Sequence, residues 1–313
     1  MLIVWQEHRD IEIDAGVDMG TKTFSANGEY LLTGHYEGVR VWRVQDGKEM
    51  ARLEMNVNSL AVSKDDNWIA GTTWEGDVII WDANTYIQKY QWRTDSEIVF
   101  GLDFSSDATR LIVASDDITA IIWDLATGNE AQRLVHERAV YAAKYSPEGD
   151  RIATATWDEV RVWDSEDGRL LYDIQVAQCD IAGLVWGYNL LLVTAKDKVW
   201  KIKGTTVSEW SIPQRRGTSR TALQNHGEFV VSATRRGVRF WDISTHTERP
   251  PIQHSQNIQS ITLSPDDQFI AITGKDGKIT MKRLSHISVS IVPSCISTSL
   301  LCSSFGSFFY LFH

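Results

Sequence analysis

The chain has 313 residues, of which 43% are hydrophobic, and it carries a formal net charge of −10 at pH 7. This length and apolar content suffice for a sizeable core, whereas the acidic balance argues against broad, non-specific binding to nucleic acid, which requires a basic surface. Of three cysteines, Cys295 and Cys302 lie near the C-terminal end, so no disulfide framework is expected and the cytoplasm or nucleus is the predicted location.

The chain consists of repeats of about 40 residues, each with four short apolar runs. In the stretch 135–176 the runs are AVYAAKYS, RIATAT, VRVW and RLLYDIQV, separated by SPEGD, WDE and DSEDG. Alternation of apolar and polar residues, bounded by Gly, Pro and Asp clusters, is typical of antiparallel strands joined by tight turns. The third run ends in tryptophan in six repeats and in methionine in the seventh, at Trp42, Trp81, Trp123, Trp163, Trp200, Trp241 and Met281.

These repeats make residues 1–286 similar to the WD40-repeat family. The resemblance implies an all-β fold, a seven-bladed WD40-like β-propeller whose blades are four-stranded antiparallel sheets. It also implies a shared scaffold with variable surfaces, so it is informative about fold and much less so about the partner.

The N-terminal segment is predicted to close the ring. Residues 2–13 read as the end of a blade without its beginning, because Trp5 stands 37 residues before Trp42. The repeat over 258–284 supplies three runs and then loses the pattern. Propellers that resemble this chain commonly complete one blade with strands from both termini, and pairing of residues 2–13 with the last repeat would remove exposed sheet edges. The apolar run here is too short, and its flanks are too acidic, for a signal peptide.

The resemblance further implies a structural hydrogen-bond network within a blade. In the fourth repeat the matching residues are His136, Thr154, Asp158 and Trp163, with Thr156 as a substitute for Thr154. A histidine, a threonine and an aspartate could be read as a catalytic set, but the repeat accounts for each of them. The sequence lacks nucleotide-binding motifs and metal-ligand spacings, so we predict no catalytic residue, no metal and no cofactor.

One turn position is predicted to form a partner-binding rim. In propellers of the resembled family, the residue before the Asp of the second turn usually points onto one rim of the disc. That position holds an aromatic residue in three of the first four repeats and a base in the last three, the set being Tyr36, Trp74, Asp116, Trp157, Lys196, Arg235 or Arg236, and Lys275. Tyrosine, tryptophan and arginine are enriched in interface hot spots. The alternative is that Trp74 and Trp157 lean on neighbouring blades and only stabilise them.

The sixth repeat adds a basic cluster. Its arginines are Arg215, Arg216, Arg220, Arg235, Arg236 and Arg239. In an acidic chain, such a sector could receive a carboxylate-rich or phosphorylated protein segment, because guanidinium groups pair bidentately with these oxygens. Single-stranded nucleic acid is a weaker candidate, and the plain alternative is a solvated rim that balances acidic neighbours.

The C-terminal tail differs in composition from the repeats. No charged residue occurs between positions 287 and 312. The tail, 287–313, is read as an extra strand with a disordered end, as a membrane anchor, or as a segment foreign to the domain. A helix of this length could cross a bilayer, but Pro293, Gly306 and many serines make the run only mildly hydrophobic.

The function predicted from the sequence is a non-enzymatic scaffold that binds a segment of a partner protein on the propeller rim. Two alternatives stay open: an enzyme or small-molecule binder that uses the central channel, and the sensing array of a larger multidomain signalling protein. Partner identity and oligomeric state cannot be read from the residues.

Overall fold

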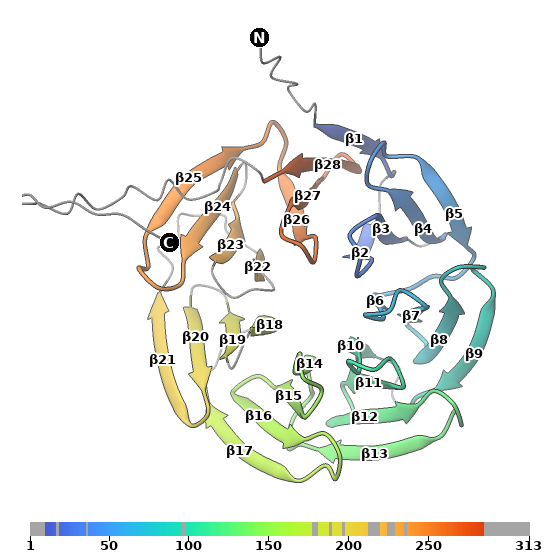
Figure 1. The fold of residues 1–313 in the computed structure, drawn as a ribbon, viewed down its shortest axis with the longest axis vertical. Helices are drawn as coiled ribbons and strands as arrows, with labels where there is room; N and C mark the ends of the chain where they lie inside the picture. Colours follow the sequence, from blue (N-terminus) through green and yellow to red (C-terminus); the bar gives the residue numbers. More distant parts are fainter. Residues whose placement is uncertain are drawn as a thin grey trace, which may run out of the picture.

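The computed structural model describes residues 10–16, 19–35, 37–95, 98–176, 181–187, 190–195, 198–211, 220–223, 229–234 and 237–284. Within them, strands β1 to β28 form seven four-stranded antiparallel sheets, arranged as blades around a common axis (Figure 1). This confirms the predicted all-β, seven-bladed propeller, including the irregular fifth repeat.

Each blade runs from an innermost first strand to an outermost fourth strand. The first strands are β2 (Met19–Phe24), β6 (Ser59–Val62), β10 (Val99–Phe104), β14 (Ala142–Tyr145), β18 (Ile181–Gly187), β22 (Arg220–Leu223) and β26 (Ile258–Leu263). The second strands are β3 (Tyr30–His35), β7 (Trp68–Thr72), β11 (Arg110–Ser115), β15 (Arg151–Ala155), β19 (Leu190–Ala195), β23 (Phe229–Ala233) and β27 (Phe269–Gly274).

The two outer positions follow the same scheme. The third strands are β4 (Gly38–Arg43), β8 (Asp77–Asp82), β12 (Thr119–Asp124), β16 (Glu159–Asp164), β20 (Lys198–Lys203), β24 (Gly237–Asp242) and β28 (Lys278–Arg283). The fourth strands are β5 (Glu49–Leu53), β9 (Gln88–Arg93), β13 (Glu130–Val135), β17 (Leu170–Gln175), β21 (Thr206–Ser211), β25 (Glu248–Gln253) and, in the last blade, β1 (Ile11–Asp14).

Burial explains why the middle strands are continuously apolar. The third strand of blade 2 reads VIIW and is packed on both faces, whereas the fourth strand, QKYQWR, alternates between exposed and half-buried positions. Strands covered on both sides lose the period-two alternation that strands with one solvated face keep. The apolar core therefore lies between neighbouring blades.

The N-terminal strand closes the ring, as predicted. Strand β1 pairs antiparallel with β28 in the register Ile11 opposite Met281. Ile13 is buried against residues of blades 7 and 1, and the carbonyl of Ala15 accepts a hydrogen bond from Arg40 Nη1 at 3.1 Å. Strand β1 therefore completes the last blade and also ties it to the first. Residues 2–9, including Trp5, lie outside the described part of the chain.

The antiparallel meander places the turns at two opposite ends of the propeller. We call the end formed by the turns between second and third strands the front face, and the opposite end the back face. Contacts between blades keep the front turns together: Asn58 Nδ2 donates to the carbonyl of Val99 at 3.1 Å, and the amide of Val140 donates to that of Ser115 at 3.0 Å.

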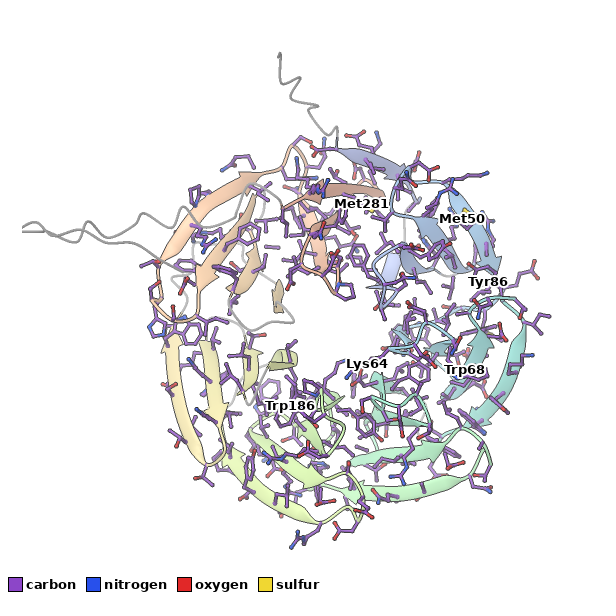
Figure 2. The ribbon with its side chains drawn as sticks, in the orientation of Figure 1. Met50, Lys64, Trp68, Tyr86, Trp186 and Met281 are labelled. Atoms are coloured by element: carbon purple, nitrogen blue, oxygen red, sulfur yellow. The ribbon has the colours of Figure 1, made fainter. Side chains whose placement is uncertain are left out.

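A bond between the third and second strands recurs in several blades. The indole N–H of Trp163 donates to Thr154 Oγ1 at 2.8 Å, and Trp42 and Trp241 make the same contact, with Thr33 at 2.9 Å and with Ser232 at 3.2 Å. Blade 7 has Met281 in place of the tryptophan (Figure 2). Methionine has no N–H, so the buried hydroxyl of Thr273 has no hydrogen-bond partner among the described residues.

The other two members of the predicted network are arranged differently. His136 Nδ1 lies 3.4 Å from Glu159 Oε1, and its ring meets that of Trp163 edge-on at 5.4 Å. Asp158 instead accepts from Thr156 Oγ1 at 3.4 Å and pairs with Arg138 at 3.3 Å. The carboxylate beside the histidine is thus that of Glu159, the residue after the predicted Asp158.

The two threonines should respond oppositely to removal of their hydroxyl groups. Thr154→Val leaves the buried indole N–H of Trp163 without an acceptor, which we expect to lower the free energy of unfolding by about 1–3 kcal/mol. Thr273→Val removes an unpaired buried hydroxyl and should be neutral or stabilising by about 1 kcal/mol. Denaturant unfolding of both variants checks this; equal losses would contradict the hydrogen-bond pattern.

Candidate functional site

The predicted rim residues that the structure describes lie on the front face. Trp74, Asp116, Trp157 and Lys275 each occupy the turn between the second and third strands of their blade and are exposed to solvent. The remaining predicted rim residues lie outside the described residues; they are Tyr36, Lys196, Arg235 and Arg236.

The predicted basic cluster of blade 6 is described only in small part. Arg215, Arg216, Arg235 and Arg236 lie outside the described residues, and Arg220 is the first residue of β22. Arg239 lies on the third strand, where it pairs with Glu248 and its guanidinium sits 4.8 Å from the ring centre of Trp241. It is therefore engaged within its blade, and we leave it out of the candidate surface.

Large apolar side chains gather on the front face of blades 2 to 4. Trp74 is 54% exposed, Ile118 40% and Trp157 36%, and they occupy the equivalent turns of three successive blades. Ile98 and Phe100, where β10 begins, are also exposed on this face. Exposed apolar patches of this kind mark interaction sites on monomeric proteins. We call these five residues the apolar front patch.

Ile118 adopts a backbone conformation that is unfavourable for its side chain. Its φ is +66°, in a turn position that Gly76 and Gly277 occupy in blades 2 and 7 with φ near +80°. A β-branched residue in this left-handed region is an outlier, and such strain is concentrated at functional positions. Alignment of the turns WEGD, DDIT and KDGK could have identified this residue from the sequence.

Ile118→Gly should stabilise the fold. The left-handed conformation costs a non-glycine residue about 1–2 kcal/mol, glycine gives back part of that gain as chain entropy, and the exposed side chain contributes little packing. We expect the free energy of unfolding to rise by about 1 kcal/mol, measured by denaturant unfolding. A marked loss of stability would mean that the isoleucine packs into the fold.

The charged residues next to the patch pair with one another. Arg138 pairs with Asp158 at 3.3 Å and Arg161 with Glu159 at 3.0 Å. Mutual pairing leaves little net charge to attract an ionic partner, and exposed pairs of this kind add little affinity. The chemistry that this part of the face offers is therefore burial of apolar side chains.

Two buried histidines should make the fold sensitive to acid. Burial lowers the pKa of His35 and of His136 to about 4, with Arg40 and Arg161 respectively acting in the same direction. The unfolded chain binds these protons near pH 6.5 and the folded chain does not, so stability should fall as the pH drops from 6.5 to 4. Melting curves of wild type and His35→Gln across this window test it, and the variant should have the flatter profile; parallel profiles would contradict the prediction. Asp46 and Asp242, whose pKa values are lowered to about 2 by hydrogen bonds, act below it.

The described residues hold no cluster of three or more His, Cys, Asp or Glu that could bind a metal ion, and no helix among them could span a membrane. Hollows occur between blades at the back face. One of about 290 Å³ lies between blades 4 and 5, lined by Asp150, Tyr172 and Trp186, and one of about 180 Å³ lies between blades 1 and 2.

Comparison with known proteins agrees with this architecture. The family model described as "WD domain, G-beta repeat" matches residues 47–82, 85–124, 129–164 and 248–281. Each match begins close to the outer strand of one blade and ends in the third strand of the next, so the repeats straddle the blades. The molecule is a ring-closed β-propeller of seven such units. It belongs to the WD40-repeat family.

Relatives of the chain are distant and have different names. It is 23% identical to autophagy-related protein 16 of Arabidopsis thaliana over 92% of this chain and 52% of that protein, and 22% identical to cilia- and flagella-associated protein 52 of Mus musculus over 82% and 37%. It is 24% identical to the U3 small nucleolar RNA-associated protein 15 homolog of Xenopus tropicalis over 66% and 41%. The chain spans about half the length of these relatives or less.

Proposed function

We propose that this protein is a non-enzymatic scaffold that binds an extended segment of a partner protein across the front face of blades 2 to 4. The apolar front patch carries the proposal. Trp74 and Trp157 act as anchors for apolar side chains of the segment, and Ile118 lies between them in the sequence of blades. Relatives that are named as associated proteins are compatible with such a role, which we place in the cytoplasm or nucleus.

Strain at Ile118 supports a binding role over a structural one. If the patch served only the fold, glycine at position 118 would serve better, as it does in blades 2 and 7. An exposed, strained isoleucine costs folding free energy and is useful when a partner buries it. The basic cluster of blade 6, as a receiver of an acidic or phosphorylated part of the segment, and the array within a larger protein remain predictions.

The experiment is affinity capture from native extract, with the full chain as bait. The test variant is Trp74→Ala/Ile118→Gly/Trp157→Ala, and the matched control is Ile87→Ala, which removes an exposed apolar side chain from a back-face turn. Proteins captured by wild type and by Ile87→Ala but lost by the still-folded triple variant support the proposal. Partners retained by the triple variant would place the docking surface elsewhere.

A further inference from the structure

The hollow between blades 1 and 2 lies on the back face, away from the apolar front patch. Its volume is about 180 Å³, below the roughly 300–1,000 Å³ of pockets that bury whole drug-sized ligands. A site of this size fits one side chain of a bound protein. It opens between the first turn of blade 1, the first turn of blade 2 and the last turn of blade 2.

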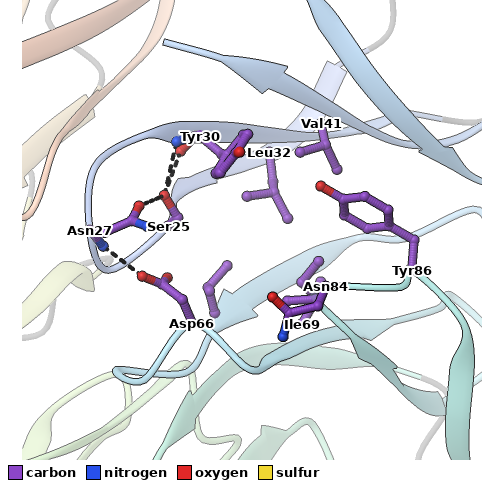
Figure 3. A pocket seen from close by; sticks show the side chains of 11 residues that line it. Ser25, Asn27, Tyr30, Leu32, Val41, Asp66, Ile69, Asn84 and Tyr86 are labelled. Carbon is purple, nitrogen blue, oxygen red and sulfur yellow. Dashed lines mark hydrogen bonds between the residues drawn. The ribbon is translucent and has the colours of Figure 1, made fainter. Parts of the chain in front are cut away.

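The lining separates into an aliphatic floor and an oxygen-rich mouth. Leu32 and Val41 of blade 1 and Ile69 of blade 2 form the floor, and Figure 3 shows the Tyr86 side chain and Asp66 on opposite sides of the space above them. Tyr30 and Asn84 complete the mouth. This arrangement suits an occupant with an apolar stem and a polar end.

Tyr86 is held in the hollow at the expense of backbone comfort. Its φ is +58°, in the turn position where blades 1, 3 and 4 have Gly47, Gly128 and Gly168 with φ of +69°. Figure 2 places the side chain at the boundary between blades 1 and 2. Part of its role is to pack beside the small Ala51 of β5, but its hydroxyl makes no hydrogen bond within the described part of the chain. Burial raises the pKa of this phenol, so it stays neutral.

Asp66 gives the mouth its charge. Its Oδ1 accepts the amide of Ala26 at 2.6 Å and its Oδ2 that of Asn27 at 2.9 Å, which fixes the carboxylate across the two turns. No lysine or arginine of the described residues forms an ion pair with it. Because each oxygen already accepts one N–H, a bidentate guanidinium has no free edge to meet, whereas an ammonium group needs a single lone pair from each of several oxygens.

We infer that this hollow is a binding site for a lysine side chain of a partner protein. The four methylenes lie on Leu32, Val41 and Ile69, and the ammonium group donates to Asp66 and to the phenol oxygens of Tyr30 and Tyr86. The acidic chain, with its net charge of −10, favours the approach of a cation. The tyrosine rings add attraction for the charge.

The test is a titration of the full chain, carrying 13C-labelled Ile, Leu and Val methyl groups, with Nα-acetyl-lysine methylamide. We expect saturable shifts of the Leu32, Val41 and Ile69 methyl signals. The uncharged Nα-acetyl-norleucine methylamide, which keeps the stem, should bind at least about tenfold more weakly, as should the arginine derivative.

Variants locate the effect. Asp66→Asn keeps an oxygen for the turn, tolerates the positive φ of this position and should weaken the lysine probe about tenfold or more. Tyr86→Phe should weaken it less, and Glu29→Gln, which removes an exposed charge on the neighbouring turn outside the hollow, should change nothing. Equal binding of the lysine and norleucine probes, an unchanged affinity in Asp66→Asn, or no saturable shift of the three methyl signals would each overturn the inference. Trp74→Ala/Trp157→Ala should leave the titration unchanged, since the front face is not involved.

Discussion

Deletion of residues 1–14 should lower the melting temperature by about 10 °C or more. The deletion removes the fourth strand of blade 7, exposes the edge of β28 and takes the buried Ile13 out of the core. One such side chain contributes about 1.5–3 kcal/mol, the lost ladder bonds add to this, and 1 kcal/mol corresponds to about 2–4 °C in a domain of this size. An open ring also presents an unpaired edge that promotes aggregation.

Point variants separate ring closure from a general effect of truncation. Ile13→Asp places a charge in the buried position and should lower the melting temperature nearly as far, whereas Glu12→Gln, on the exposed side of the same strand, should leave it unchanged. A synthetic peptide of residues 1–16 added to the truncated chain should raise its melting temperature again. A truncated chain that melts like the wild type would show that β1 contributes nothing to closure.

Loss of the two front-face tryptophans should weaken partner binding at least about 100-fold. Tryptophans at the centre of an interface each cost about 2–4 kcal/mol on truncation, and a loss of about 2.7 kcal/mol already corresponds to a factor of 100. Trp74→Ala/Trp157→Ala should act mainly on the dissociation rate, because anchors hold a bound segment rather than steer its approach. Both side chains are substantially exposed, so the melting temperature should change little.

The captured partner supplies the ligand for this measurement. Surface-immobilised partner is titrated with wild type, the double variant and Ile87→Ala, all at the same ionic strength. Ile118→Gly belongs in the same series, because it should bind more weakly while unfolding later than the wild type. Losses of less than about a factor of 5 in the double variant would show that the tryptophans only stabilise the neighbouring blades.

The fold was predictable because every level of the sequence agrees with it. The third-strand tryptophans, the turn clusters and the incomplete last repeat led to seven blades and to closure by the N-terminal segment. The family-model matches show the physical basis of that closure: the last match ends at Met281, in the third strand, so its fourth strand must come from elsewhere. Pairing by Ile11–Asp14 meets this need.

The site was less predictable because exposure and backbone conformation are not written in the repeat pattern. Turn position alone singled out Trp74 and Trp157, but Ile118 was missed since the rule considered the residue before the aspartate. Phe100 was missed because an apolar residue at the start of a first strand reads as core. The hollow beside Tyr86 needs the packing of two blades, and no local pattern reveals it.

The replacement for the expected Asp158 in the blade 4 network has a similar origin. The turn between β15 and β16 brings Glu159, rather than Asp158, within 3.4 Å of His136. A one-residue difference in turn geometry decides which of two adjacent carboxylates faces the histidine, and spacing alone cannot resolve it.

Site-specific photo-crosslinking tests the central claim most directly. The photoreactive amino acid p-benzoylphenylalanine is incorporated in place of Trp157, where its aromatic ring preserves the anchor, and separately in place of Ile87 on the back face. With the captured partner present, irradiation should give a covalent adduct from position 157 and none from position 87. An adduct from position 87 alone, with position 157 inert although the protein still binds, would contradict docking on the front face.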